Sequence, residues 1–169
     1  MNPQLHTFIS VHSILRYLVI LLTLVVAIQS VIGIQKKGPF LKGNRLTALF
    51  MLISCDLQLL VGLAVFYMGG HLQMLQKGQA MANHATRFFA VEHPLSMIIG
   101  IILVHFAYNT AKSPFPDAKK FKRMFWSSFI ALFLFVSQTP WPYKKDIGRP
   151  WFPGSGSGDT TTIVQPVNA

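Results

Sequence analysis

Four long apolar segments most constrain what this chain can fold into. They lie at about residues 8–34, 46–68, 88–110 and 121–139, and each comes close to the roughly 20 apolar residues that a membrane helix needs. Glycine and proline, which end helices, stand between the segments and after the last one, at 38–39, 69–70, 114–116 and 140–142. We therefore predict an all-α integral membrane protein whose residues 1–143 form an up-down-up-down four-helix bundle.

Composition agrees with a membrane location and excludes several soluble classes. Only 12% of the 169 residues are charged, about half of what an ordinary soluble domain carries (roughly 25%). The formal net charge is +10, but the basic residues lie between the apolar segments, which indicates membrane topology and no nucleic-acid partner. A single cysteine, Cys55, excludes a disulfide within the chain and any CxxC motif.

The basic residues also predict an orientation. The side of the membrane on which the chain starts is named side A, and the opposite side is named side B. Side B carries nine Lys and Arg and side A carries five, while Arg16 falls inside the first segment. The positive-inside rule makes side B cytoplasmic, so both termini would lie in the periplasm of a bacterium with the protein in its inner membrane. Residues 144–169 are expected to form an extramembrane tail, flexible after 153 where Gly-Ser repeats begin.

Ionisable side chains inside a membrane are costly, so each is a candidate functional residue. This chain has six in its apolar segments: His12, Arg16, Asp56, Glu92, His93 and His105. The first and third segments run in the same direction, and His12 and His93 each lie about one turn inside the side A end. In a four-helix bundle these two segments are diagonal partners across the core. Two histidines at one depth on facing helices are the axial ligands that one haem b needs, so both are expected to bind its iron.

Residues near this pair are candidates for holding the rest of a haem. Arg16 lies one turn deeper than His12 on the same helix face, and Arg87 lies in the side A loop. Either guanidinium would suit a haem propionate. Gly100 lies two turns beyond His93 and would leave room for a flat macrocycle. The alternative for Gly100 is close helix packing, as small residues provide in membranes.

The remaining three ionisable residues keep more than one interpretation. Asp56 would form a buried ion pair with Arg16, or serve a quinone or proton relay. Glu92 would orient a histidine ligand, cap the third helix, or share in the proton relay. His105 has no second span histidine at its depth, which leaves a single-ligand haem, a His/Met pair or a hydrogen bond to a quinone.

The side A loop gives a weaker metal hypothesis. It holds His71, Met74, Met81 and His84, and imidazole and thioether groups suit copper. Their spacing fits no tight copper motif, and the alternative is an amphipathic segment at the membrane surface.

Several short motifs resemble those of small four-span bacterial membrane proteins labelled cytochrome-b-like. They are His12-Ser-Ile-Leu-Arg-Tyr17, Asp56-Leu-Gln-Leu-Leu-Val-Gly-Leu63, Glu92-His93-Pro94 and Pro140-Trp141-Pro142, and the similarity extends over about residues 5–143. The resemblance implies haem and electron transfer, with His12 and His93 as the motif histidines. His105 departs from a paired-ligand pattern.

The leading functional hypothesis is a small b-type cytochrome, or cytochrome-like subunit, that transfers electrons near the periplasmic face, with a quinone as a further cofactor. A non-catalytic accessory subunit of a larger membrane complex is the alternative, and a copper-handling membrane protein is the third. Whichever hypothesis holds, the expected partners of the protein are lipid, other membrane subunits or further copies of the chain. No nucleophile–base arrangement is visible in the sequence, which disfavours a stand-alone enzyme.

Overall fold

The computed structural model describes residues 2–154, and most of these residues are helical with no strand among them. The prediction of an all-α fold is therefore confirmed for this part of the chain. The long helices are α1 (Pro3–Lys36), α2 (Lys42–Met68), α5 (His93–Lys112) and α6 (Asp117–Ser137). Short helical turns join α2 to α5: α3 (His71–Gln76), η1 (Gln79–Met81), α4 (His84–Arg87) and the π-helical turn η2 (Phe88–Glu92).

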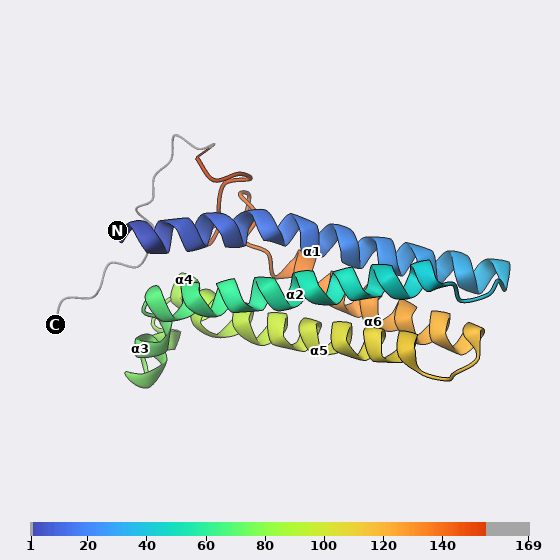
Figure 1. The fold of residues 1–169 in the computed structure, drawn as a ribbon. Helices are drawn as coiled ribbons and strands as arrows, with labels where there is room; N and C mark the ends of the chain where they lie inside the picture. The colour runs from blue at the N-terminus through green and yellow to red at the C-terminus, as the bar shows by residue number, and fades with distance from the viewer. Residues whose placement is uncertain (1, 155–169) are drawn as a thin grey trace.

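The four long helices lie side by side with their neighbours antiparallel (Figure 1). α1 packs on α2 and α6, and α5 packs on the same two helices. α1 and α5 are consequently diagonal to each other and run in the same direction. The α2–α5 connection and residues 138–154 lie at the end where α1 begins, which is side A.

Local sequence explains where these helices begin and end. The Asn2 side chain accepts a hydrogen bond from the Gln4 backbone N–H at 3.0 Å, and Pro3 occupies the first turn of α1, where it costs no hydrogen bond. Lys37 ends α1 in the left-handed region with φ 49°. Gly70 takes φ 77° after α2, a conformation that glycine adopts without steric cost.

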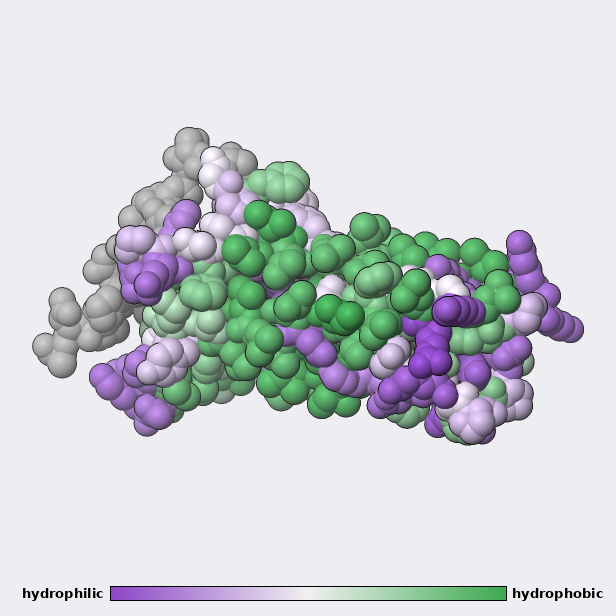
Figure 2. Space-filling model, in the orientation of Figure 1, coloured by the Kyte–Doolittle hydropathy of each residue, from purple (hydrophilic) through white to green (hydrophobic). Residues whose placement is uncertain are grey.

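The surface and interior have the polarity expected of a chain in lipid. Large apolar side chains such as Leu60 and Phe133 are about two-thirds exposed, and Figure 2 shows a hydrophobic middle with hydrophilic residues gathered toward the two ends. Thr23, Ser30 and Ser128 are fully buried between helices, and each hydroxyl donates to the carbonyl four residues earlier. Small polar residues that allow close helix packing are typical of membrane proteins.

Three helical segments are long and apolar enough to cross a membrane: Pro3–Lys36, Lys42–Met68 and His84–Lys112. They contain the first three predicted spans. The fourth predicted span, 121–139, falls mainly on α6, which begins with a basic stretch that includes Lys119, Lys120, Lys122 and Arg123 and is not among the three.

Candidate functional site

A cavity of about 300 Å³ lies between α1, α2, α5 and the segment after α6. That volume is at the lower end of the range for small-molecule and cofactor sites, roughly 300–1,000 Å³. Most of the wall is apolar, and it includes side chains such as Ile9, Leu59, Phe66, Met97 and Phe135. The titratable nitrogen groups in the wall are three histidines and two arginines, namely His12, His71, His93, Arg16 and Arg149, and neutral polar side chains are contributed by Ser13, Gln58 and Thr139.

The structure brings His12 and His93 together in this cavity. Their ring centres are 6.2 Å apart, and the ring planes meet at 74°. His12 comes from α1 and His93 from the first turn of α5, which are the diagonal helices. The pair on which the sequence argument depends is therefore a feature of the structure.

His93 is positioned by an irregular helix start and by α6. The π-helical turn η2 directly precedes it, and Pro94, which has no backbone N–H to give to the preceding turn, directly follows it. The His93 Nδ1 lies 2.9 Å from the Gln138 carbonyl oxygen. A carbonyl can only accept, so Nδ1–H donates and the Nε2 lone pair of the neutral ring is free to bind a metal.

His12 is positioned by α2. The Gln58 amide donates to the His12 backbone carbonyl at 2.9 Å. Gly62 lies against the ring, because a Cβ placed at Gly62 would be 3.1 Å from His12 Cε1. That distance is shorter than most real Cβ contacts, so glycine at 62 lets the imidazole keep this place.

Four buried polar side-chain atoms have no hydrogen-bond partner among the described residues: His12 Nδ1, Arg16 Nε, Gln58 Oε1 and His71 Nδ1. All four residues line the cavity. Buried polar atoms are nearly always paired in native proteins. Their gathering around one cavity leaves four polar atoms there that a ligand could pair.

Arg16 is held by the segment that follows α6. Its Nη2 donates to the carbonyls of Pro150 at 3.1 Å and Trp151 at 2.9 Å, and to the Tyr17 hydroxyl at 2.9 Å. The Tyr17 hydroxyl in turn donates to the Trp151 carbonyl at 2.5 Å. Up to residue 154 the expected extramembrane tail is thus folded back on α1, and the flexibility expected after 153 lies almost wholly outside the described residues.

Two residues of the cavity wall were missed by the sequence argument for a haem site. Arg149 lies 5.1 Å above the Phe89 ring, and the His71 ring stacks on the same phenylalanine at 6.2 Å. Burial first, and then the nearby Arg149 charge, lower the pKa of His71, and burial lowers that of Arg149. The sequence offers His71 as a copper ligand in the side A loop, and no pattern in the sequence places Arg149 beside it.

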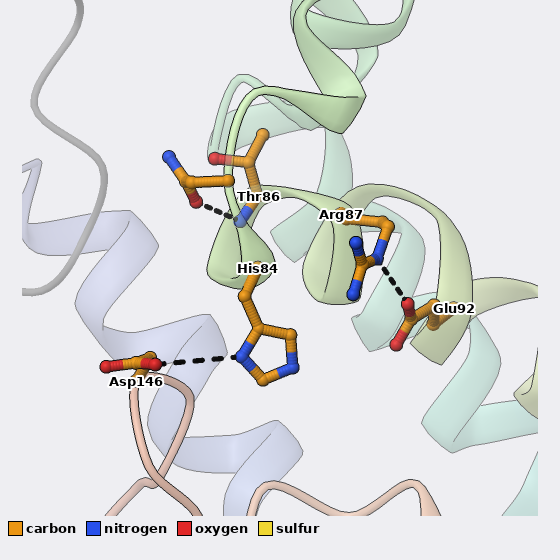
Figure 3. Close-up of polar contacts among 6 residues, drawn as sticks. His84, Thr86, Arg87, Glu92 and Asp146 are labelled. Carbon is orange, nitrogen blue, oxygen red and sulfur yellow. Dashed lines mark hydrogen bonds and ion pairs between the residues drawn. The ribbon is translucent and has the colours of Figure 1, made fainter.

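Arg87 and Glu92 pair with each other outside the cavity wall (Figure 3). The Arg87 Nε lies 2.7 Å from a Glu92 carboxylate oxygen, with both side chains about 40% exposed. Figure 3 also shows His84 facing Asp146 at 3.8 Å. His71 and His84, the two histidines of the copper hypothesis, therefore face different surroundings.

Gly100 lies outside the cavity wall and packs against Phe135. A Cβ at this buried position would overlap the Phe135 ring. Phe135 itself lines the cavity, so the glycine allows α5 and α6 to approach and lets the aromatic ring form part of the wall.

Replacing Gly100 by alanine is expected to lower the free energy of unfolding by about 1–3 kcal/mol, as overpacking of a well-packed core does. Thermal unfolding in detergent, followed by circular dichroism, measures the change. Gly43→Ala is the matched control, because a Cβ there meets nothing within 4 Å. The double variant Gly100→Ala/Phe135→Leu should recover part of the loss, and equal stabilities of Gly100→Ala and wild type would contradict the packing role.

Asp56 and His105 form a pair of their own on the outside of the helices. His105 Nε2 lies 2.9 Å from Asp56 Oδ1, and the side chains are 48% and 44% exposed. Arg16, the partner predicted for Asp56 in a buried ion pair, instead donates to the carbonyls of Pro150 and Trp151, so that prediction is wrong. Figure 2 shows a hydrophilic patch within the hydrophobic surface over α2 and α5.

No group of three or more His, Cys, Asp and Glu residues suited to a metal ion occurs within residues 2–154. A site built on His12 and His93 would supply two protein ligands, and a haem iron takes one or two ligands from a protein. Comparisons of the chain with protein-family models, with curated proteins and with solved structures find no match.

Proposed function

We propose that this protein is a small membrane b-type cytochrome that holds one haem in the cavity and transfers electrons. The observation that carries the proposal is the 6.2 Å between the ring centres of His12 and His93. A ligating imidazole nitrogen lies about 2 Å from its metal and roughly 1 Å from its own ring centre, so two rings on opposite sides of one metal have centres about 6 Å apart. His12 and His93 would therefore be the residues that hold a haem iron.

The side chains around the pair support the same ligand. The Gln138 carbonyl fixes the tautomer of His93 that leaves Nε2 free. Gly62 leaves room beside His12, and apolar side chains cover most of the remaining wall. The haem, when bound, would supply reversible one-electron chemistry. The protein would bind it, orient its ligands and exclude water.

We place the protein in a bacterial inner membrane as a four-span bundle with both termini in the periplasm. Three helical segments have the length and apolarity for crossing. For α6 the support is its exposed surface, where Phe129, Ile130, Phe133 and Val136 are all at least 40% exposed. Its basic residues lie in the first two turns, where long side chains can reach the membrane surface. Side B is cytoplasmic in this arrangement because it carries the larger number of basic residues.

We further propose that Asp56 and His105 bind a hydroxyl group of a lipid-soluble hydroquinone and accept its proton. The pair is half exposed on a helix surface that would face lipid, where a polar group without a polar partner is costly. Each side chain keeps hydrogen-bonding capacity, on the second carboxylate oxygen and on Nδ1. Glu92 is less suited to this role because Arg87 already neutralises it.

Replacing Asp56 by asparagine is expected to weaken binding of a short-chain hydroquinone about tenfold or more, since one charged hydrogen-bonding partner is worth roughly 1.5–3 kcal/mol. Equilibrium dialysis of the detergent-solubilised protein measures the affinity without relying on haem. Asp117→Asn is the control, an equal change in the first turn of α6. Equal affinity of Asp56→Asn and wild type would exclude the pair as the hydroquinone site.

The visible absorption spectrum of the purified protein, with a pyridine haemochrome assay, tests the haem directly. We expect one haem per chain with the sharp reduced-state bands of a bis-histidine b-type centre. A protein without haem that co-purifies with large membrane partners would instead favour the accessory-subunit alternative. Copper in place of haem iron in a metal analysis would favour the third hypothesis.

A further inference from the structure

Two guanidinium groups line the cavity, and no carboxylate does. Arg16 and Arg149 are both in the wall, whereas the lining residues include neither aspartate nor glutamate. The ion pairs among residues 2–154 are His84–Asp146, Arg87–Glu92 and His105–Asp56, so none of them neutralises either arginine. The cavity therefore has two positive charges in a wall that is mostly apolar and holds no aspartate or glutamate.

Neutral groups satisfy only part of what these arginines require. Arg16 is 7% exposed, and all its hydrogen bonds leave from Nη2 toward two carbonyls and a hydroxyl. Its Nε–H is buried without a partner. Arg149 has the Phe89 ring beside it, 5.1 Å from the guanidinium carbon. A buried charge without a counter-charge is strongly destabilising, so an anionic group is expected here.

The backbone after α6 links the two arginines of the cavity wall. The Arg149 N–H donates to the Pro140 carbonyl at 2.9 Å, and the Gly148 N–H donates to the Lys144 carbonyl at 2.9 Å, which closes this segment into a compact loop. The two residues directly after Arg149 are those whose carbonyls accept from Arg16. The Arg16 guanidinium thus binds the backbone directly after Arg149, although 132 residues lie between the two arginines in the sequence.

We propose that Arg16 and Arg149 bind the carboxylates of the ligand that fills this cavity, and that residues 138–154 are a wall of the binding site. The inference rests on the proposed haem, whose two propionates are the carboxylates in question. Arginine suits the task because its planar fork can donate two parallel hydrogen bonds to one carboxylate. Arg87, the sequence-based candidate, is already paired with Glu92 and lies outside the wall.

Binding of haem and of haem dimethyl ester, in which both propionates are esterified, tests the proposal. Both compounds are titrated into the detergent-solubilised protein after its haem has been removed. The ratio of the two affinities is then compared between variants. The ester also partitions into micelles, but this lowers its apparent affinity equally for every variant and so does not affect the comparison. The wild type should prefer the free acid by on the order of tenfold or more, as charge-assisted hydrogen bonds imply. Arg149→Gln should reduce this preference several-fold, and Arg149→Lys, which keeps the charge, should retain more of it.

Arg87→Gln is the matched control, the same substitution on side A outside the cavity, and it should leave the ratio at the wild-type value. A preference that is equal in Arg149→Gln and wild type, while Arg149→Gln has wild-type thermal stability, overturns the role of Arg149. If wild type binds both forms alike, the carboxylate proposal fails while the haem site remains. If wild type binds neither form, the proposed function itself fails and this inference fails with it.

Discussion

Replacing His93 by glutamine is expected to abolish stoichiometric haem binding. The variant keeps a side chain of similar size but loses the imidazole nitrogen that the Gln138 carbonyl leaves free for iron. Loss of a group that merely orients a metal ligand costs about 10–100-fold in affinity, so loss of the ligand itself should cost on the order of 100-fold or more. The haem-to-protein ratio after purification, from the pyridine haemochrome and the protein concentration, measures the effect.

His12→Gln should behave in the same way, because the second axial position comes from α1. His84→Gln is the matched control, since this histidine faces Asp146 and lies outside the cavity wall. Its haem content should equal that of wild type. Full haem content in both His12→Gln and His93→Gln would show that neither histidine is an axial ligand, and the proposed site would then be wrong.

Helix content and the histidine pair could be predicted from the sequence because both depend on position along one axis. Apolar segments near 20 residues set the helices, and counting turns from the side A end put His12 and His93 at one depth. Depth survives small errors in helix ends, since one residue moves a side chain by only about 1.5 Å along the helix. The structure accordingly has the two rings in contact range.

The partner of Asp56 could not be predicted because it depends on rotation about the helix axis. Each residue turns a helix face by about 100°, so a small error in the assumed packing face changes which neighbour a side chain meets. The structure turns Asp56 toward His105 on the outer surface and Arg16 toward Trp151. Both groups were recognised as important, but the sequence could not specify their partners.

His71 and Arg149 were missed for another reason. Both belong to connecting segments, His71 at the start of the six-residue helix α3 and Arg149 in the loop after α6, and the path of such segments is set by individual turns and hydrogen bonds. Two hydrogen bonds fix the loop after α6: the Arg149 backbone N–H donates to the Pro140 carbonyl, and the Arg16 side chain donates to the Pro150 carbonyl. The sequence of residues 144–154 is typical of a solvent-exposed tail, so it does not predict contacts with residues as distant in the chain as Arg16.

In intact cells, each single-cysteine variant is expected to be either fully labelled or not labelled, according to the side of the membrane on which its cysteine lies. Cys55→Ala removes the one native thiol. Each test variant then carries one new cysteine in place of an exposed lysine, at position 77, 145, 42 or 119 (Lys77→Cys, Lys145→Cys, Lys42→Cys or Lys119→Cys). A membrane-impermeant maleimide on intact bacteria should label positions 77 and 145, which lie on side A. Positions 42 and 119 on side B should react only after the cells are lysed, because side B is predicted to be cytoplasmic.

The comparison of positions 119 and 145 decides whether α6 crosses the membrane. They flank α6 (Asp117–Ser137) closely, so a crossing helix must leave them on opposite sides, while a helix lying along the surface would leave them on the same side. Labelling in lysed cells is the control that each thiol is reactive. Equal labelling of 119 and 145 in intact cells would reduce the bundle to three spans. It would also place Arg149 on the side opposite the start of α1, and the hydrogen bonds from Arg16 to Pro150 and Trp151 would then be lost. We therefore expect four crossings, the arrangement that would keep the cavity wall intact in a membrane.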